Sequence, residues 1–156
     1  MAIAITLQNF LASKNADYEV VFHQPTTTSR QTARAAHIPA GCLVKSVILE
    51  DEHGFLMAVV PADCKVRVHD LDRQLHRHLR LTTEEELARL FDDCERGAVP
   101  PLGIAYGLET VVDDRVESAA EVYFEGGDHQ ALIRMRGAQF TDLLKDAGHS
   151  RFAEQI

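Results

Sequence analysis

The feature that most constrains the fold is a pair of apolar segments separated by a short polar stretch. The segments cover residues 43–49 and 55–60, and the stretch between them ends on Gly54. Short apolar runs rich in β-branched residues are typical of buried strands. Glycine readily adopts the positive φ angles that tight hairpin turns require. We therefore predict an antiparallel hairpin whose second strand ends at Pro61.

Apolar spacing and capping residues predict several further elements around this hairpin. Helices are predicted at residues 6–15, at 30–36 after a cap at Thr28 or Ser29, and near 70–79. A further helix is predicted after a capping box that pairs Thr82 or Thr83 with Glu85 or Glu86, and the last predicted helix runs through Phe140, Leu143 and Leu144. The predicted strands lie at residues 18–22, 65–68 (an edge strand), 110–112, 121–124 and 130–135. This order of helices and strands predicts one α+β domain over residues 1–156, built on a mixed sheet.

The composition is that of an ordinary globular domain. Of the 156 residues, 46% are hydrophobic and 26% are charged, which indicates neither a disordered nor a fibrous chain. The sequence has no apolar run of membrane-spanning length and no N-terminal pattern of a secretory signal, so we expect a cytoplasmic protein. Cys42, Cys64 and Cys94 fit neither a disulfide framework nor a CxxC motif, and we expect them to be reduced thiols.

The net charge restricts how the chain can bind nucleic acid. A formal charge of −8 argues against broad, sequence-independent binding, which depends on many Lys and Arg side chains at phosphates. Any contact with RNA must therefore be local, and we expect neither DNA nor a membrane as a partner. Basic residues recur in one part of the sequence, where an ordinary mixed surface is the alternative interpretation: Arg30, Arg34, Lys45, Lys65, Arg67, Arg73 and Arg77.

Lys45 stands out because it interrupts an otherwise aliphatic predicted strand. An ammonium group is costly to bury in such a strand. The residue can lie at a sheet edge or extend its amine to solvent along an apolar stem. Alternatively, Lys45 binds an anion at a cleft, and the sequence of the strand alone leaves both interpretations open.

The loop at residues 97–103 combines flexible and stiff positions. Gly97 and Gly103 permit unusual backbone angles, whereas Pro100 and Pro101 restrict the chain between them. Such a loop can be a plain connection between elements. Beside a cleft, it can instead hold a water molecule or donate backbone hydrogen bonds to an oxyanion, and one such donor contributes about 2.7–4 kcal/mol in hydrolases.

These features occur in an order that spans nearly the whole chain. The ordered set is His23 with the threonine-rich turn 26–28, the alanine-rich helix, Val44-Lys45-Ser46, residues 58–62 (AVVPA), residues 97–103 (GAVPPLG) and residues 126–129 (GGDH). In this set the chain resembles the YbaK family, which includes the editing domain inserted in bacterial prolyl-tRNA synthetases and its free-standing relatives. The resemblance implies a curved, barrel-like mixed sheet surrounded by helices, with one cleft.

The resemblance also implies an activity, the hydrolysis of the ester bond of mischarged aminoacyl-tRNA in trans. In the family the strand lysine matching Lys45 is essential and engages the terminal nucleotide, and the GxxxP loop matching 97–101 shapes the aminoacyl pocket. The residues expected to be catalytic by this match are Lys45, Gly97, Pro101 and His129. The residues expected to contact the substrate are Thr26, Thr28, Ser46, Ala98, Val99, Pro100 and Gly127.

The residue inventory agrees with water as the nucleophile. The sequence has no GxSxG elbow, and no Ser or Cys can be paired with His and Asp by spacing alone. An aminoacyl ester is already activated, so an oriented water and oxyanion stabilisation suffice, with the ribose hydroxyl of the substrate and backbone groups assisting. We expect no cofactor and no metal. The expected partners are the aminoacylated acceptor end of tRNA and, as a second partner, prolyl-tRNA synthetase.

A synthetase site for proline cannot strongly reject smaller amino acids, because one missing methylene is worth only about 1–3 kcal/mol. Alanine and cysteine are therefore the expected misacylated residues, and no pocket residue in the sequence separates them from serine or threonine.

Other interpretations use other residues. A metal hydrolase would need ligands such as His69, His76 and His78, but the last two fall in a predicted helix, where positions two apart face different directions. A non-catalytic module that binds tRNA or a synthetase is the alternative outside enzymes. We expect a structural role for His23. Asp113, Asp114 and Asp128 are acidic enough for a cation site, but we expect turn and loop roles for them. Glu125 and Asp128 have the chemistry for acid–base catalysis, but no spacing pairs them.

Overall fold

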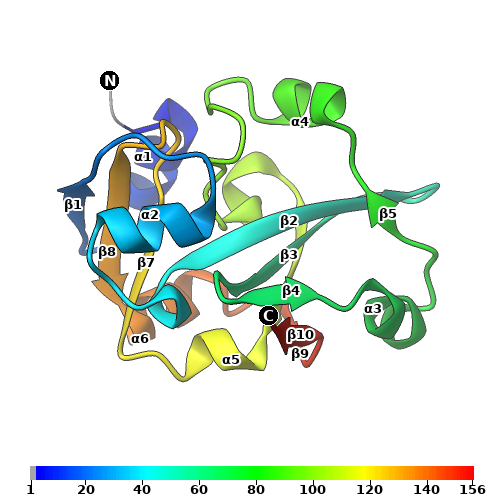
Figure 1. The fold of residues 1–156 in the computed structure, drawn as a ribbon. Coiled ribbons are helices and arrows are strands. Elements are labelled where there is room, and N and C mark those ends of the chain that lie inside the picture. Colours follow the sequence, from blue (N-terminus) through cyan, green and yellow to red (C-terminus); the bar gives the residue numbers. More distant parts are fainter. Residues whose placement is uncertain (1–2) are drawn as a thin grey trace.

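The computed structural model describes residues 3–156, which form helices and strands in mixed order (Figure 1). The helices are α1 (Ile5–Ser13), α2 (Ser29–Ala35), α3 (Val68–Leu75), α4 (Glu84–Leu90), α5 (Asp114–Glu117) and α6 (Gly137–Leu143). The strands are β1 (Glu19–Phe22), β2 (Val44–Asp51), β3 (Gly54–Pro61), β4 (Cys64–Val66), β5 (Arg80–Leu81), β6 (Glu109–Asp113), β7 (Glu121–Glu125), β8 (Ala131–Arg136), β9 (Gly148–Ser150) and β10 (Ala153–Gln155). Short 3-10 turns occur at Ala40–Cys42 and Gly103–Tyr106.

The predicted hairpin is confirmed and forms the centre of the molecule. β2 and β3 pair in antiparallel register from Val44 opposite Pro61 to Asp51 opposite Gly54, whose φ is 129°. β6 adds in parallel to β3, β9 in parallel to β6, and β5 in antiparallel to the far side of β2. The result is a mixed sheet with the order β5-β2-β3-β6-β9.

Both faces of this sheet are buried, which explains why its strands are apolar at consecutive positions rather than at alternate ones. On one face Ile48, Met57 and Val59 pack into a cluster that includes residues of α1 and α6. On the other face Leu49, Leu56 and Val60 contribute to a second cluster with Leu71 of α3 and Phe152. The hairpin is thus the layer between two apolar clusters.

Two smaller sheets accompany the central one. Strands β1, β8 and β7 form a three-stranded antiparallel sheet, and β10 pairs with β4. A single parallel bridge between Leu43 and Tyr123 joins the start of β2 to β7. The α+β class and the mixed sheet are confirmed. The strands within residues 3–156 form no closed barrel, so the barrel-like closure expected from the resemblance is not confirmed.

One helix is shorter than predicted. The helix expected near 70–79 is α3, and it ends at Leu75 because His76 adopts the left-handed conformation with φ of 55°. The prediction that His76 and His78 lie in a helix is therefore wrong. The caps expected for the other helices are present: the Thr28 side chain forms a capping box with Gln31, and the Thr83 side chain accepts the Glu86 N–H.

In residues 3–156, none of the helices has the length and apolar character that a membrane span requires.

Candidate functional site

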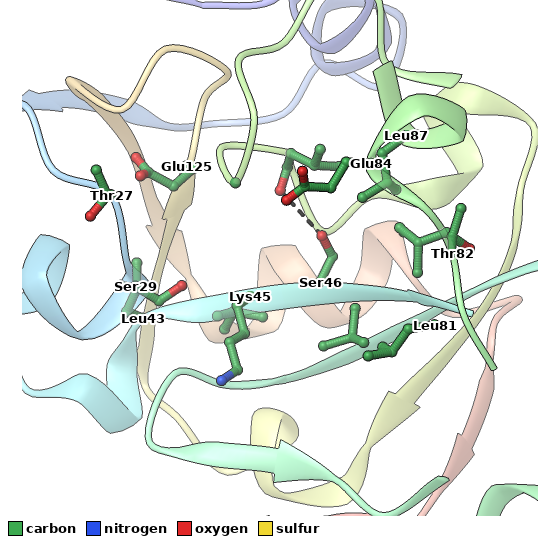
Figure 2. A pocket seen from close by; sticks show the side chains of 15 residues that line it. Thr27, Ser29, Leu43, Lys45, Ser46, Leu81, Thr82, Glu84, Leu87 and Glu125 are labelled. Carbon is green, nitrogen blue, oxygen red and sulfur yellow. Dashed lines mark hydrogen bonds between the residues drawn. The ribbon is translucent and has the colours of Figure 1, made fainter. Parts of the chain in front are cut away.

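A cavity of about 480 Å³ lies along one edge of β2, with β7 and the turn before α2 on one side and the β5–α4 segment on the other (Figure 2). The segment at residues 97–99 also borders it. Its lining residues come from five parts of the chain: Thr27, Ser29, Leu43, Val44, Lys45, Ser46, Val47, Ile48, Leu81, Thr82, Glu84, Leu87, Gly97, Val99 and Glu125. Four of the residues predicted from the sequence are among them: Lys45, Ser46, Gly97 and Val99.

The edge of β2 that borders the cavity is open. On this side of β2, the pairing within residues 3–156 is limited to Leu49 and Glu50 with β5 and to the bridge from Leu43 to β7. The carbonyl of Leu43 faces β3, where it accepts the Ala62 N–H, and the carbonyl of Ile48 faces the other way, where it accepts the Thr82 N–H. Because backbone groups alternate along a strand, the N–H and C=O of Ser46 also point toward the open edge. Neither group has a hydrogen-bond partner among the described residues.

Lys45 and Ser46 are neighbours on β2 and point to opposite sides of the strand (Figure 2). The Lys45 Nζ lies 3.5 Å from the carbonyl oxygen of Ala62, and the side chain is half-buried. Burial lowers the pKa of Lys45, while the nearby Cys64 and Asp63 act in the opposite direction. No carboxylate of residues 3–156 forms an ion pair with this amine. The structure therefore leaves the Lys45 ammonium available to an external anion at the rim of the cavity.

The loop after Cys94 contacts both β2 and the turn after β7. The Ser46 Oγ donates to the carbonyl of Val99 at 3.3 Å. Gly97 has φ of 79°, and a Cβ at this position would lie 3.2 Å from the His129 Cε1, so the close approach requires glycine. Within the loop, Ala98, Pro100 and Pro101 are buried and are not among the residues that line the cavity. These three residues position the loop rather than border the cavity.

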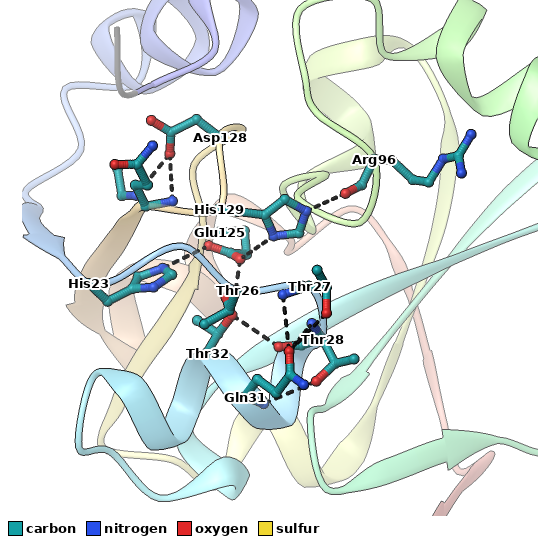
Figure 3. Close-up of polar contacts among 12 residues, drawn as sticks. His23, Thr26, Thr27, Thr28, Gln31, Thr32, Arg96, Glu125, Asp128 and His129 are labelled. Atoms are coloured by element: carbon teal, nitrogen blue, oxygen red, sulfur yellow. Dashed lines mark hydrogen bonds and ion pairs between the residues drawn. The ribbon is translucent and has the colours of Figure 1, made fainter.

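Glu125 is the centre of a buried polar cluster at the cavity wall (Figure 3). Its Oε1 lies 3.3 Å from the His23 Nε2, and its Oε2 lies 3.2 Å from the His129 Nδ1 and 3.3 Å from the Thr32 Oγ1. The other ring nitrogen of His129 hydrogen-bonds to the carbonyl of Arg96, in the loop before Gly97. Burial raises the pKa of Glu125, and the two histidines oppose this shift. His129 thus does not line the cavity itself; it contacts Glu125, which does.

Backbone contacts fix the turn that carries His129. The carbonyl of Gly126 accepts the Ala4 N–H at 2.8 Å, and the carbonyl of Gly127 accepts the Glu95 N–H at 2.7 Å. The Asp128 Oδ1 accepts the N–H groups of Gln130 and Ala131, both at 2.9 Å. Asp128 therefore has the turn role expected for it, and Gly127 supports the site from outside the cavity.

In the threonine-rich turn, the residue that borders the cavity is Thr27 rather than Thr26 or Thr28. Thr28 caps α2, and the Thr26 hydroxyl lies 2.5 Å from that of Thr32. Thr26 therefore supports Thr32, which in turn contacts Glu125.

The sequence indicated Glu125 only as an acid–base candidate without a partner, and it did not indicate the wall formed by Leu81, Thr82, Glu84 and Leu87. The capping threonines and the apolar stripe predicted the helix that carries this wall. No local pattern could place the helix opposite β7, because that placement depends on the pairing of β5 with β2.

Within residues 3–156, no three or more His, Cys, Asp and Glu side chains are grouped so that they could hold a metal ion.

Comparisons with known proteins place this geometry in a family. Residues 23–143 match the model of a family described as the aminoacyl-tRNA editing domain. A crystal structure of a candidate trans-editing enzyme for prolyl tRNA synthetase is 26% identical, with a TM-score of 0.84, over 97% of this chain and 96% of that one. The comparison with curated proteins finds no match.

Two other structures share the fold. The hypothetical protein APE2540 is 21% identical, with a TM-score of 0.84, over 96% of this chain and 99% of that one. A candidate signal transduction protein from Marinobacter aquaeolei VT8 is 26% identical, with a TM-score of 0.76, over 96% of this chain but only 30% of that one. The fold therefore also occurs as one part of a larger chain.

Proposed function

The chain belongs to the aminoacyl-tRNA editing domain family, and from this membership we propose that it hydrolyses, in trans, the ester bond of mischarged aminoacyl-tRNA. The observation that carries the proposal is that Lys45, the open edge of β2 and the segment at 97–99 border a single cavity. A volume of about 480 Å³ accommodates a small amino acid and part of the terminal ribose. The activity would take place in the cytoplasm, where tRNA is charged.

The position of Lys45 supports a contact with the tRNA rather than with the amino acid. Its amine lies on the side of β2 opposite Ser46 and has no carboxylate partner among the described residues. In our proposal this amine binds a phosphate or ribose oxygen of the terminal nucleotide while the amino acid occupies the cavity. The net charge of −8 then confines contact with the RNA to the acceptor end.

The backbone supplies donors for the reacting ester. Pro100 and Pro101 have no N–H, and the Ala98 N–H is already bonded to the carbonyl of Glu95. The N–H groups of Gly97, Val99 and Ser46 have no partner among the described residues, and all three residues line the cavity. We assign to these groups the orientation of the attacking water and the stabilisation of the oxyanion. Pro101 then acts by stiffening the loop, and His129 acts by holding Glu125 and the loop together.

Alanine and cysteine esters of the tRNA for proline are the proposed substrates. Support comes from the resemblance in sequence and from the structural similarity to a candidate trans-editing enzyme for prolyl tRNA synthetase. Prolyl-tRNA synthetase is accordingly the proposed source of the mischarged tRNA.

The proposal is tested with a lysine substitution and a matched control. Lys45→Met keeps most of the apolar stem and removes the charge, so we expect deacylation of alanyl-tRNA for proline to fall at least about 100-fold, by loss of the contact that positions the substrate. Lys65→Met removes a charge from an exposed lysine paired with Glu154 and should leave the rate unchanged. Full activity of a folded Lys45→Met protein would refute the assignment.

A further inference from the structure

Glu125 is a buried carboxylate that lacks a permanent cationic partner. Its exposed fraction is 6%, and it lines the cavity. Among residues 3–156, its ion-pair partners are only the imidazoles of His23 and His129, and no Lys or Arg side chain is within reach. A buried carboxylate is costly unless a cation or several hydrogen-bond donors compensate it. The donors that surround Glu125 therefore decide what else it can bind.

In each histidine, one ring nitrogen donates its hydrogen to a backbone carbonyl rather than to Glu125. The His23 Nδ1 lies 2.7 Å from the carbonyl of Gln24, and the His129 Nε2 contacts the carbonyl of Arg96. A carbonyl oxygen only accepts hydrogen bonds, so these two ring nitrogens carry the hydrogens. In a neutral imidazole the other nitrogen then has a lone pair and no hydrogen. The two nitrogens that face Glu125 consequently donate nothing to it while the histidines are neutral.

The remaining neighbour is the Thr32 hydroxyl, which has a single hydrogen. This hydroxyl is within reach of both the Thr28 carbonyl, at 3.1 Å, and the Glu125 Oε2, at 3.3 Å. While both histidines are neutral, an ionised Glu125 thus receives at most one hydrogen bond from the side chains around it, although a carboxylate can accept about four. Glu125 therefore keeps unused acceptor capacity for a cation that a ligand brings into the cavity.

We propose that Glu125 binds the α-ammonium group of the amino acid that is esterified to the tRNA, an inference that rests on the proposed function. The substrate ammonium provides the positive charge and the donors that the carboxylate lacks. Glu125 and Thr27 lie on one wall of the cavity, and Leu81 and Leu87 lie on the opposite wall (Figure 2). The ammonium then faces Glu125, and the amino acid side chain faces Leu81 and Leu87. Glu84, on the same wall as these leucines, is already paired with Arg96 at 3.0 Å.

This binding mode defines a substrate class. The enzyme acts on esters of amino acids with a free α-amino group and spares esters whose amino group is blocked, such as peptidyl-tRNA or formylated initiator tRNA. An editing enzyme without this distinction would hydrolyse intermediates of translation.

The test compares two esters of the same size with and without the ammonium group. Alanyl-tRNA is converted to lactyl-tRNA, in which a hydroxyl replaces the ammonium, and kcat/KM is measured for both with wild-type enzyme, Glu125→Gln and Glu121→Gln. Glu125→Gln should lower kcat/KM about 10- to 100-fold on alanyl-tRNA, as expected for loss of a charge-assisted hydrogen bond. The loss on lactyl-tRNA should be at least about tenfold smaller, because that ester has no charge to bind.

Glu121→Gln is the matched control, since Glu121 lies on the same strand but is paired with Arg134 outside the cavity. Glu121→Gln should leave kcat/KM at the wild-type value on both alanyl-tRNA and lactyl-tRNA. A loss with Glu125→Gln that is equal on the two esters, or no loss at all in a protein with wild-type Tm, would overturn the ammonium assignment. The wild-type rate on alanyl-tRNA tests the proposed function separately, so the two failures are distinguishable.

Discussion

Asp51 and Glu125 are two buried carboxylates with the same exposed fraction, 6%, and opposite surroundings. Asp51, at the end of β2, accepts hydrogen bonds from the Arg77 guanidinium at 2.7 and 2.6 Å and from the His53 N–H at 2.9 Å. Glu125, at the end of β7, has polar side-chain contacts within residues 3–156 with two imidazoles and one hydroxyl only, at 3.2–3.3 Å. Hydrogen bonding to Arg77 holds the pKa of Asp51 well below its usual range, whereas burial raises the pKa of Glu125.

The difference separates a group that supports the fold from a group that is available to a ligand. Arg77 also donates to the carbonyl of Gly54 at 3.2 Å, so it fastens the hairpin turn to the segment after α3. Among the described residues, no Lys or Arg forms a comparable ion pair with Glu125. Equal burial therefore does not imply an equal role, because the supply of donors within the chain decides whether a carboxylate still needs a partner.

Apart from substitutions of Lys45 and Glu125 themselves, the largest effect is expected from disturbing the loop that meets the Glu125 cluster. Gly97→Ala places a Cβ 3.2–3.3 Å from the His129 ring at a φ of 79°, so the loop or the ring must move. We expect kcat/KM for deacylation to fall by about tenfold or more, because small misplacements at a reacting centre are costly.

Gly107→Ala separates this crowding from backbone strain. Gly107 has a similar φ of 70°, and its Cβ would meet nothing within 4 Å. Both variants should therefore lose about 1–2 kcal/mol of stability, but Gly107→Ala should retain full activity. Equal loss of activity in the two variants would show that the contact with His129 has no functional role.

Removing the charge should affect stability in opposite ways at the two carboxylate sites. Asp51→Asn removes the charge that Arg77 binds, so Tm should fall while kcat per folded molecule stays at the wild-type value. Glu125→Gln removes a charge that the chain compensates poorly, so Tm should stay the same or rise while activity falls. Thermal melting with activity assays on both variants checks this. A larger fall in Tm for Glu125→Gln than for Asp51→Asn would contradict the claim that Asp51 supports the fold and Glu125 does not.

The pH dependence of stability should have opposite signs at the two sites. The pKa of Asp51 is lowered in the folded state, so its charge contributes to folding stability above the unfolded-state pKa of about 3.9. This contribution is lost as the pH falls below that value. The folded pKa of Glu125 is raised, so its ionisation lowers stability as the pH rises above about 4.3. The Tm difference between wild type and Asp51→Asn should thus shrink toward acidic pH. The benefit of Glu125→Gln should grow from acidic to neutral pH.

The smallest effect is expected at Ser46. Ser46→Ala removes the hydrogen bond from the hydroxyl to the Val99 carbonyl and keeps the backbone N–H at the open edge. We expect a loss of about 0.5 kcal/mol in stability and a change in kcat/KM below about threefold. Ser118→Ala, which removes a similar bond to the Arg115 carbonyl far from the cavity, is the control. A loss of activity as large as that of Lys45→Met would mean that the hydroxyl itself binds the substrate.

Much of the fold could be predicted because its strongest signals are local. The apolar runs around Gly54 predicted the hairpin, and threonine caps predicted the starts of α2 and α4. The short strands β5, β9 and β10 carry no apolar periodicity, and their pairing depends on distant strands. The predicted end of α3 was wrong because His76 adopts a left-handed conformation, which cannot be predicted from a histidine at this position.

The candidate site was predictable only in part, for the same reason. Lys45 is conspicuous within an aliphatic strand, and the glycines and prolines of the 97–103 loop are conspicuous by composition. Within the Glu125 cluster only His129 is close in sequence, four residues after Glu125. His23 and Thr32 are 102 and 93 positions away, so no local spacing reveals their contacts with Glu125. Thr27 could not be chosen over Thr26 and Thr28, because the orientation of three adjacent threonines follows from the cap of α2.

The most direct test of the account is turnover of a mischarged tRNA at catalytic enzyme concentration. Purified tRNA for proline charged with alanine, cysteine, serine, threonine or proline is incubated with wild-type enzyme far below the substrate concentration, and the remaining ester is followed in time. We predict many turnovers on the alanine or cysteine ester and none on the proline ester. Binding that protects every ester from spontaneous hydrolysis, without turnover, would contradict an editing hydrolase and indicate a binding module instead.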